Sequence, residues 1–174
     1  VGGHLKRAYQ YLGNNVVPVS DSSNTVENNV ANAIAVDFGT IYITDWHGFT
    51  FGMSVRNFSE EVEYGYDSFQ LPLTFRIGGS IDVLSFLPSL SEKQSLRMAL
   101  EALHPRSYPE RLNFGLEYSF MDLGNLRLGY LFNYDERNLT YGAGIKLGPL
   151  KIDYALTPFG VFDSVSRISV SLAR

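Results

Sequence analysis

The 174-residue chain contains no cysteine. This absence excludes disulfide bonds, thiolate nucleophiles and zinc sites built on thiolates. A chain without cysteine is compatible with both reducing and oxidising compartments, so the absence by itself assigns no compartment.

The chain also has no run of 18 apolar residues, which excludes a transmembrane helix and leaves a β-barrel as the only route through a membrane. Charged residues make up only 18% of the chain, below the usual quarter. His4, His47 and His104 have no metal-ligand spacing, so we predict no metal site and no cofactor. The pI near 5.3 and the acidic loops disfavour nucleic acid as a partner.

Aromatic residues and glycine are abundant instead, with 12 Phe, 11 Tyr and 16 Gly. This mixture favours strands and turns over helices. From residue 110 onward, apolar and polar residues alternate almost without a break, as in RLNFGLEYSF (111–120), LRLGYLFNY (126–134), TYGAGIKL (140–147) and LKIDYALT (150–157). Such alternation places one apolar and one polar face on each strand.

Earlier segments show the same period, and we predict about ten strands, most of eight to eleven residues, which is enough to cross a bilayer at a tilt. One segment, LSEKQSLRMALEALH (90–104), competes as a helix because Leu, Met, Ala and Glu are good helix formers. Its neighbours favour a strand. The fold class we predict is therefore all-β, as one antiparallel up-and-down barrel domain over residues 1–174 in the outer membrane.

The apolar face is unusually aromatic, and rings such as Tyr9, Tyr11, Trp46 and Phe120 stand near expected strand ends, as the aromatic girdles of membrane barrels do. A soluble sandwich or barrel that binds an apolar ligand in an aromatic interior has the same period and stays open as an alternative.

Charge separates by face when each strand residue is assigned by parity. The polar face carries nine bases and five acids, a balance of +4, and the rest of the chain then carries −8 of the total of −4. In a barrel these side chains would line the lumen, where ion pairs between strands brace the wall or an excess of base attracts anionic solutes. The bases are Lys6, Arg56, Arg76, Arg97, Arg111, Arg127, Lys146, Lys151 and Arg167, and the acids are Asp37, Asp82, Glu101, Glu117 and Asp153.

The connections alternate between two sides, as barrel topology requires. Loops at 12 to 32, 58 to 70, 104 to 109, 135 to 138 and 158 to 164 are predicted to face outward, and those at 45 to 48, 84 to 93, 121 to 125 and Gly148-Pro149 to face inward. The two longest outer loops are the candidate partner surfaces. The second is acidic, with Glu60, Glu61, Glu63 and Asp67.

Two patterns in the sequence are similar to those of enzyme sites. Gly142, Gly144 and Gly148 lie close together as in a phosphate loop, but alternation resumes at residue 150, so the helix that a dinucleotide site needs is missing. A Ser-His-Asp set could be assembled from Ser107, His104 and Asp135 on outer loops, as any loop-rich sequence permits. We therefore predict that the chain is not an enzyme.

The segments LPLTFRIGGSIDV, HPRSYPERLNFGLEYSF, LRLGYLFNYDERNLTYGAGIKLG and KIDYALTPFGVFDSVSRISV together resemble the C-terminal part of the PorV/PorQ family of bacterial outer-membrane proteins, relatives of the FadL-like fatty-acid transporters. The resemblance covers roughly residues 33 to 172. It implies a barrel of about fourteen strands, of which this chain supplies about ten, with a signal peptide, plug and first strands elsewhere. It also implies work with the type IX secretion system on secreted cargo, or passage of fatty-acid-like solutes, in outer-membrane lipid.

Overall fold

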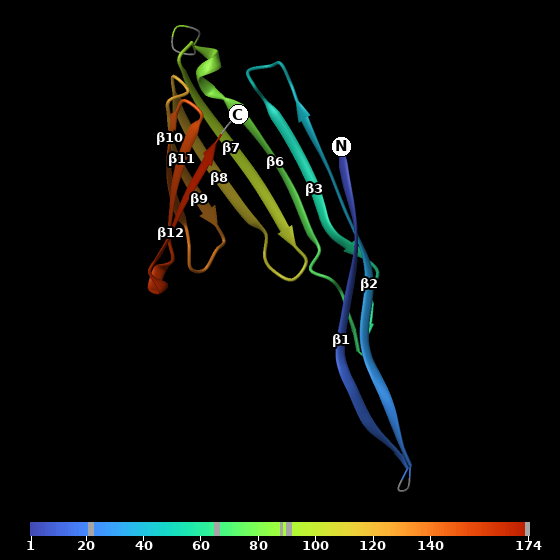
Figure 1. Ribbon diagram of the computed structural model, residues 1–174. Helices are drawn as coiled ribbons and strands as arrows, with labels where there is room; N and C mark the ends of the chain where they lie inside the picture. The colour runs from blue at the N-terminus through green and yellow to red at the C-terminus, as the bar shows by residue number, and fades with distance from the viewer. Residues whose placement is uncertain (21–22, 65–66, 88, 90–91, 173–174) are drawn as a thin grey trace. The chain divides into compact units, whose positions relative to one another are not determined.

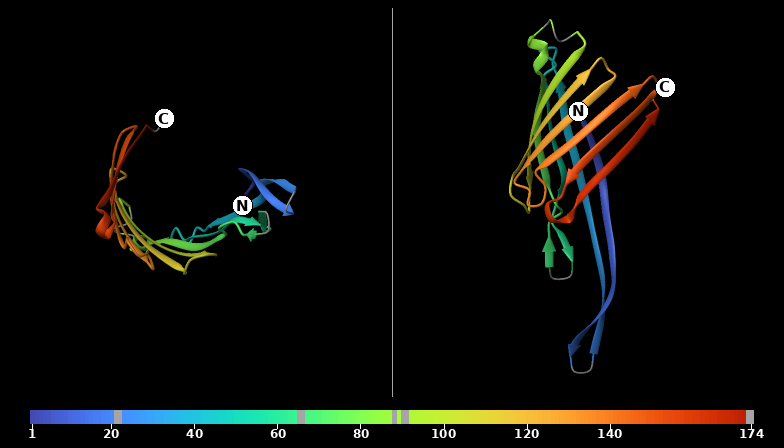
Figure 2. Two further views of the ribbon diagram at one scale, coloured as in Figure 1. Left: turned by 90° about the horizontal axis from the view of Figure 1, so that it is seen from below. Right: turned by 90° about the vertical axis from the view of Figure 1, so that its left-hand side faces the viewer.

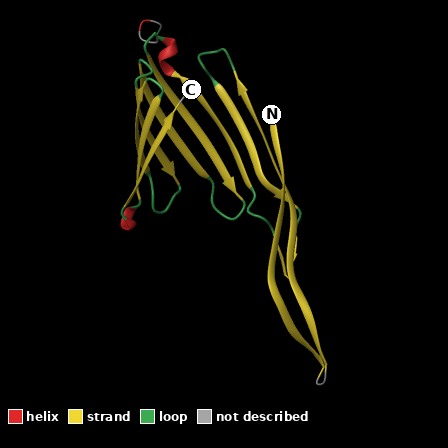
Figure 3. Cartoon of the chain, viewed as in Figure 1, coloured by secondary structure: helices red, strands yellow, loops and turns green. Residues whose placement is uncertain are grey.

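The computed structural model describes residues 1–20, 23–64, 67–87, 89 and 92–172. The protein is all-β and antiparallel (Figures 1 and 3). Its strands are β1 (Gly2–Ser20), β2 (Ser23–Ile43), β3 (Thr50–Ser59), β4 (Val62–Tyr64), β5 (Asp67–Phe69), β6 (Thr74–Asp82), β7 (Gln94–Pro105), β8 (Arg111–Phe120), β9 (Gly124–Phe132), β10 (Leu139–Leu147), β11 (Leu150–Pro158) and β12 (Ser164–Leu172). Two short 3-10 helices are η1 (Val83–Phe86) and η2 (Gly160–Phe162).

Ten strands form one up-and-down sheet in the order β1-β2-β3-β6-β7-β8-β9-β10-β11-β12, and β4 and β5 pair separately. The expectation of about ten alternating strands is thus confirmed. Within the described residues no ladder joins β1 to β12, so each of these strands has one neighbour and these ten strands are not closed into a barrel. A barrel needs its first and last strands to pair, and alternation along single strands carries no information on that pairing.

The chain divides into two compact units. The first unit comprises residues 1–40, 54–75 and 105–107, and the second comprises residues 41–53, 76–104 and 108–174. None of the helices in the described part of the chain is long and apolar enough to cross a membrane.

In the first unit, β1 and β2 form a hairpin in register from Gly2↔Gly39 to Ser20↔Ser23, with irregularities at Tyr11/Asn14 and at Pro18/Ser20. The predicted loop at 12 to 32 was therefore wrong, because most of it lies in these two strands, with residues 21 and 22 outside the described part. Tyr9 and Tyr11 consequently lie within a strand and not near its end. Asparagine is common in this segment and rare in strands. It interrupts the alternation of apolar and polar residues, so the pairing of β1 with β2 could not be predicted there.

The predicted loop at 58 to 70 was also wrong in part, since β4 and β5 form a short hairpin with the pairs Val62↔Phe69, Glu63↔Ser68 and Tyr64↔Asp67. Residues 65 and 66 lie outside the described part. Val62 is buried, which gives this small hairpin an apolar anchor.

In the second unit, the segment that competed as a helix is strand β7, as its neighbours predicted. It pairs along its length with β8, for example at Met98↔Leu116 and Ala99↔Gly115. Cross-strand packing overrides helix propensity here.

The Gly148-Pro149 pair connects β10 to β11 as a tight turn, as predicted, with Gly148 at φ +60° and Leu147 opposite Leu150. The two 3-10 helices lie at opposite ends of the strands of the second unit, η1 after β6 and η2 after β11 (Figure 2).

Candidate functional site

The strand registers place the predicted charged residues of the second unit on one face of the sheet. Glu117 on β8 stands between Arg97 on β7 and Arg127 on β9, and Arg127 in turn stands opposite Gly142 on β10. Residues in register share a face, so the parity assignment made from sequence holds across these four strands.

Arg127 is the centre of this face. Its Nε donates to Glu117 Oε2 at 2.6 Å, and its Nη1 donates to Asp153 Oδ1 at 2.9 Å. Lys151 Nζ lies 3.3 Å from the other oxygen of Asp153. One guanidinium therefore links β8 to β11 across two intervening strands, with two cations balancing two carboxylates.

Glycine on β10 makes this crossing possible. A Cβ at Gly142 would meet Arg127 Cβ at 3.3 Å and Cδ at 3.6 Å, so the arginine side chain lies over the glycine. At Gly144 a Cβ would meet Asp153 Oδ1 at 2.5 Å and Asn125 Oδ1 at 2.6 Å. These two glycines provide the room that side chains of the neighbouring strands occupy.

A second, looser group lies at the other side of β7. Arg76 Nη1 is 3.8 Å from Glu101 Oε1, and Asn113 Nδ2 donates to Glu101 Oε2 at 3.0 Å. Asp82 departs from the predicted lining role, because its Oδ1 accepts from the backbone N–H groups of Leu84 and Leu96, each at 3.1 Å. An aspartate directly before a turn is a capping residue, and that signal could have identified it from sequence.

Arg111 takes part in a stack at the strand ends that sequence reasoning missed. Its guanidinium lies 5.2 Å from the ring centre of Tyr108 and 4.6 Å from that of Tyr134. Arg137 continues the stack at 4.9 Å from Tyr134 and 5.6 Å from Phe159. The five side chains alternate aromatic and cationic and join three connections, which no local sequence pattern reveals.

The remaining bases of this face are less engaged. Lys146 stands opposite Lys151, and Arg167 on β12 stands opposite Ala155. Among the described residues, Arg97, Lys146 and Arg167 form no ion pair.

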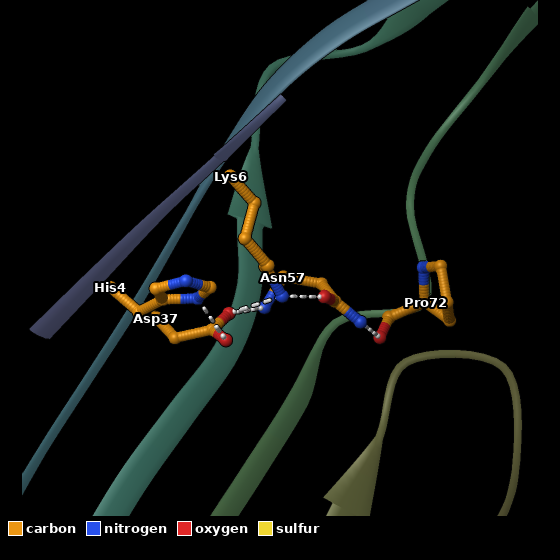
Figure 4. Close-up of polar contacts among 5 residues, drawn as sticks. All are labelled: His4, Lys6, Asp37, Asn57 and Pro72. Carbon is orange, nitrogen blue, oxygen red and sulfur yellow. Dashed lines mark hydrogen bonds and ion pairs between the residues drawn. The ribbon is translucent and has the colours of Figure 1, made fainter. Parts of the chain in front are cut away.

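The first unit holds its own polar cluster, shown in Figure 4. Lys6 Nζ lies 2.7 Å from Asp37 Oδ1 and donates to Asn57 Oδ1 at 2.5 Å, while the Asn57 N–H donates to the same carboxylate at 2.8 Å. Asn57 Nδ2 donates to Pro72 O at 3.0 Å, and His4 Nδ1 is 3.9 Å from Asp37 Oδ2. Asn57 has φ +59°, a conformation that asparagine tolerates, and the cluster ties β1, β2 and β3 together. The neighbouring Arg56 is exposed.

The acidic candidates for partner binding lie near β4 and β5. Glu60 and Glu61 are exposed, and Glu61 Oε1 accepts from Gln70 Nε2 at 2.8 Å. The side chains of Glu63 and Asp67 lie outside the described part. Their use by a partner stays a prediction.

Exposure of the two faces is inverted relative to a water-soluble sheet. On the apolar face, Leu126 is 62% and Ile145 is 47% exposed. On the polar face, the side chains of Arg127, Glu117 and Asp153 are only 37%, 33% and 23% exposed. In the first unit Ile34 is 64% exposed while Ala35 on the opposite face is 2% exposed. Soluble proteins rarely leave contiguous apolar surface open in this way.

The apolar face is also hollowed in the second unit. A groove of about 560 Å³ runs over β3, β6, β7 and β8, with Phe49, Phe51, Leu100 and Phe114 among its lining residues. Small residues open it, since the ring of Phe49 lies 3.4 Å from the position that a Cβ of Gly79 would take.

His104, the histidine of the possible Ser-His-Asp set, contacts a carboxylate. His104 Nδ1 lies 3.1 Å from Glu110 Oε1, and no group of three or more metal-ligating His, Cys, Asp or Glu occurs among the described residues. The chain matches no protein-family model and no curated protein sequence.

Proposed function

We propose that this chain forms an outer-membrane β-barrel protein of PorV/PorQ type, which acts in type IX protein secretion and surface attachment or in FadL-like transport of hydrophobic solutes. The observation that carries the proposal is the inverted exposure of the sheet. Leu126 and Ile145 are exposed, while Arg127 and its two carboxylates are more covered. Lipid is the solvent that makes such an apolar surface stable.

Strand length supports the same proposal. A strand tilted in a bilayer needs about nine to eleven residues. Strands β3 and β8 have 10 residues, and β6, β9, β10, β11 and β12 have 9 each. Strand β7 has 12 residues, and β1 and β2 have 19 and 21. Soluble strands average roughly five to six residues, so the lengths of the seven strands of 9 or 10 residues favour a bilayer as the environment.

The choice of secretion or transport rests on the resemblance of the chain to the PorV/PorQ family. Secreted cargo or a component of the secretion machinery would meet the exposed acidic segment at Glu60 and Glu61. A fatty-acid-like solute would instead use the interior. Both assignments place the protein in the bacterial outer membrane, with its apolar face in lipid.

The test uses two adjacent residues on β12 that point to opposite faces. Because the chain has no cysteine, Ile168→Cys and Ser169→Cys each introduce a single site for a nitroxide spin label. In vesicles, the label at 168 is expected to collide with oxygen, which concentrates in lipid, and the label at 169 with an aqueous nickel chelate.

The matched pair controls for local mobility, since the two sites are neighbours on one strand. If the label at 168 were shielded from oxygen and nickel alike in a protein that stays soluble without detergent, the membrane proposal would fail. Heat-modifiable gel mobility of the membrane fraction gives a second, independent readout.

The apolar groove supports a second candidate, a soluble β-protein that binds an apolar ligand. Its volume of about 560 Å³ lies in the range of small-molecule sites. A fatty-acid fluorophore should then bind the soluble protein, and Ala102→Trp should block it by filling the groove. Protein that is monodisperse only in detergent would rule this candidate out.

A further inference from the structure

A small hollow on the polar face of the second unit lies beside the Arg127 network. Its volume is about 200 Å³, and it is lined by residues of β9, β10, β11 and β12. Water occupies roughly 30 Å³ per molecule in the liquid, so the hollow holds a ligand with the volume of about seven waters. Its polar lining residues include two arginines, Arg127 and Arg167, and the hydroxyl residues Thr140, Thr157 and Ser169.

One row of residues across four strands forms the hollow. Arg127 stands opposite Gly142, Gly142 opposite Ala155, and Ala155 opposite Arg167. The Arg127 side chain lies over Gly142, and the small side chain of Ala155 leaves space between it and Arg167 at the other end of the row. At roughly 4.8 Å per strand, the Cα atoms of the two arginines are about 14 Å apart, a span that two arginine side chains can close on a small ligand.

The charges around the hollow favour an anion. Both oxygens of Asp153 are already engaged, one by Arg127 at 2.9 Å and one by Lys151 at 3.3 Å. Arg127 already donates hydrogen bonds from its Nε and Nη1 to carboxylates. Arg167, in contrast, is exposed and forms no ion pair within the described residues. An exposed guanidinium recognises planar or tetrahedral oxyanions through its fork of N–H donors.

Hydroxyl groups complete the lining. Ser169 stands opposite Asp153 and two residues from Arg167, and Thr157 lies two residues from Ala155, so both share the polar face. Each can donate a hydrogen bond to an oxyanion that Arg167 holds.

We propose that the hollow between Arg127 and Arg167 is a binding site for a small oxyanion, a carboxylate or phosphate group, with Arg167 as the principal ligand. Arg127 is the fixed wall of the site, because its own charge is balanced by Glu117 and Asp153. The site requires only this face of the second unit, so the proposal of an oxyanion site does not depend on insertion of the protein into a bilayer.

The experiment titrates the full chain in detergent micelles with sodium phosphate and, separately, with sodium acetate at constant ionic strength. NMR of the arginine Nε–H groups and calorimetry should show saturable binding that shifts the Arg167 signal. Binding of phosphate alone, of acetate alone or of both identifies the source of the oxyanion, and each supports the site.

Three variants separate a built site from general charge. Arg167→Gln should weaken binding at least tenfold. Ala155→Val fills the hollow without changing the charge and should also weaken binding at least tenfold, with valine well tolerated in a strand. Arg111→Gln removes one positive charge four strands away and should leave binding unchanged.

The proposal is overturned if neither anion saturates, if Arg111→Gln weakens binding as much as Arg167→Gln, or if Ala155→Val binds like the parent chain. The fluorescence of Trp46, the single tryptophan, reports on the folding of the second unit in every variant.

Discussion

The strongest test of the charged face is removal of the Arg127 guanidinium. Arg127→Gln leaves Glu117 and Asp153 without the donors that lie 2.6 and 2.9 Å away. Lys151 still neutralises Asp153, so Glu117 loses more. The network spans β8 to β11, and its loss should therefore lower the free energy of unfolding of the second unit as a whole.

The magnitude follows from exposure. Fully exposed ion pairs contribute about 0.2 to 1 kcal/mol each, and breaking a fully buried pair costs roughly 3 to 5 kcal/mol. With side chains 23% to 37% exposed, these pairs lie between the two limits. We expect Arg127→Gln to destabilise the chain by about 2 kcal/mol, with a coupling to Glu117→Gln of about 1 kcal/mol in a double-mutant cycle.

Urea unfolding in micelles, followed by the fluorescence of Trp46, measures these values. Arg97 provides the matched control, since it stands in register with Glu117 on the other side and forms no ion pair with it. The Arg97/Glu117 coupling should stay near zero. A coupling for Arg127/Glu117 no larger than that of the control would refute the argument that this guanidinium braces the sheet.

Three further predictions concern other contacts. Gly144→Ala should lower the stability of the second unit measurably in urea. The control Gly124→Ala, whose added methyl would meet nothing closer than 3.5 Å, should change the stability little. Equal effects would contradict the conclusion that Gly144 makes room for neighbouring side chains. Tyr134→Leu removes the ring between two guanidinium groups, at about 0.5 to 1 kcal/mol each, and should lower stability by about 1 to 2 kcal/mol, with unaltered stability counting against the stack. A hydrogen bond from its own backbone N–H and the attraction of His104 lower the pKa of Glu110. The stabilisation from the Glu110 carboxylate is therefore present above the ordinary carboxyl pKa and disappears as the pH falls through the lowered value. NMR titration of His104→Gln should show a partial return of the Glu110 pKa toward its ordinary value, and an unchanged titration would exclude the imidazole as a cause.

Alternation was sufficient to predict most of the sheet. Strands β8 to β12 follow from period two alone, and the Gly148-Pro149 turn fixes the register of β10 with β11 because Leu147 must then stand opposite Leu150. The polar face of the second unit was correctly assigned by the same rule. Segments without alternation were missed, and the asparagine-rich half of the β1–β2 hairpin is the clearest case.

Specific partners could not be predicted from parity. Sequence placed Arg127 on the polar face, yet its choice of Glu117 and Asp153 depends on register across four strands and on a diagonal reach over Gly142. Asp82 has the same parity as these residues, but it lies where a strand ends, and its carboxylate accepts hydrogen bonds from backbone N–H groups. Closure of the sheet depends on strand edges, about which residue patterns within a strand say nothing.

The glycines on β10 connect these observations. In a sheet whose polar face meets water, charged side chains extend outward into solvent, and they do not fill the space beside a glycine in the next strand. Here Arg127 lies down over Gly142, and Asn125 and Asp153 converge over Gly144. The charges are packed against the sheet while leucine and isoleucine of the other face stay open. Lipid around the apolar face, as we propose, would account for this arrangement.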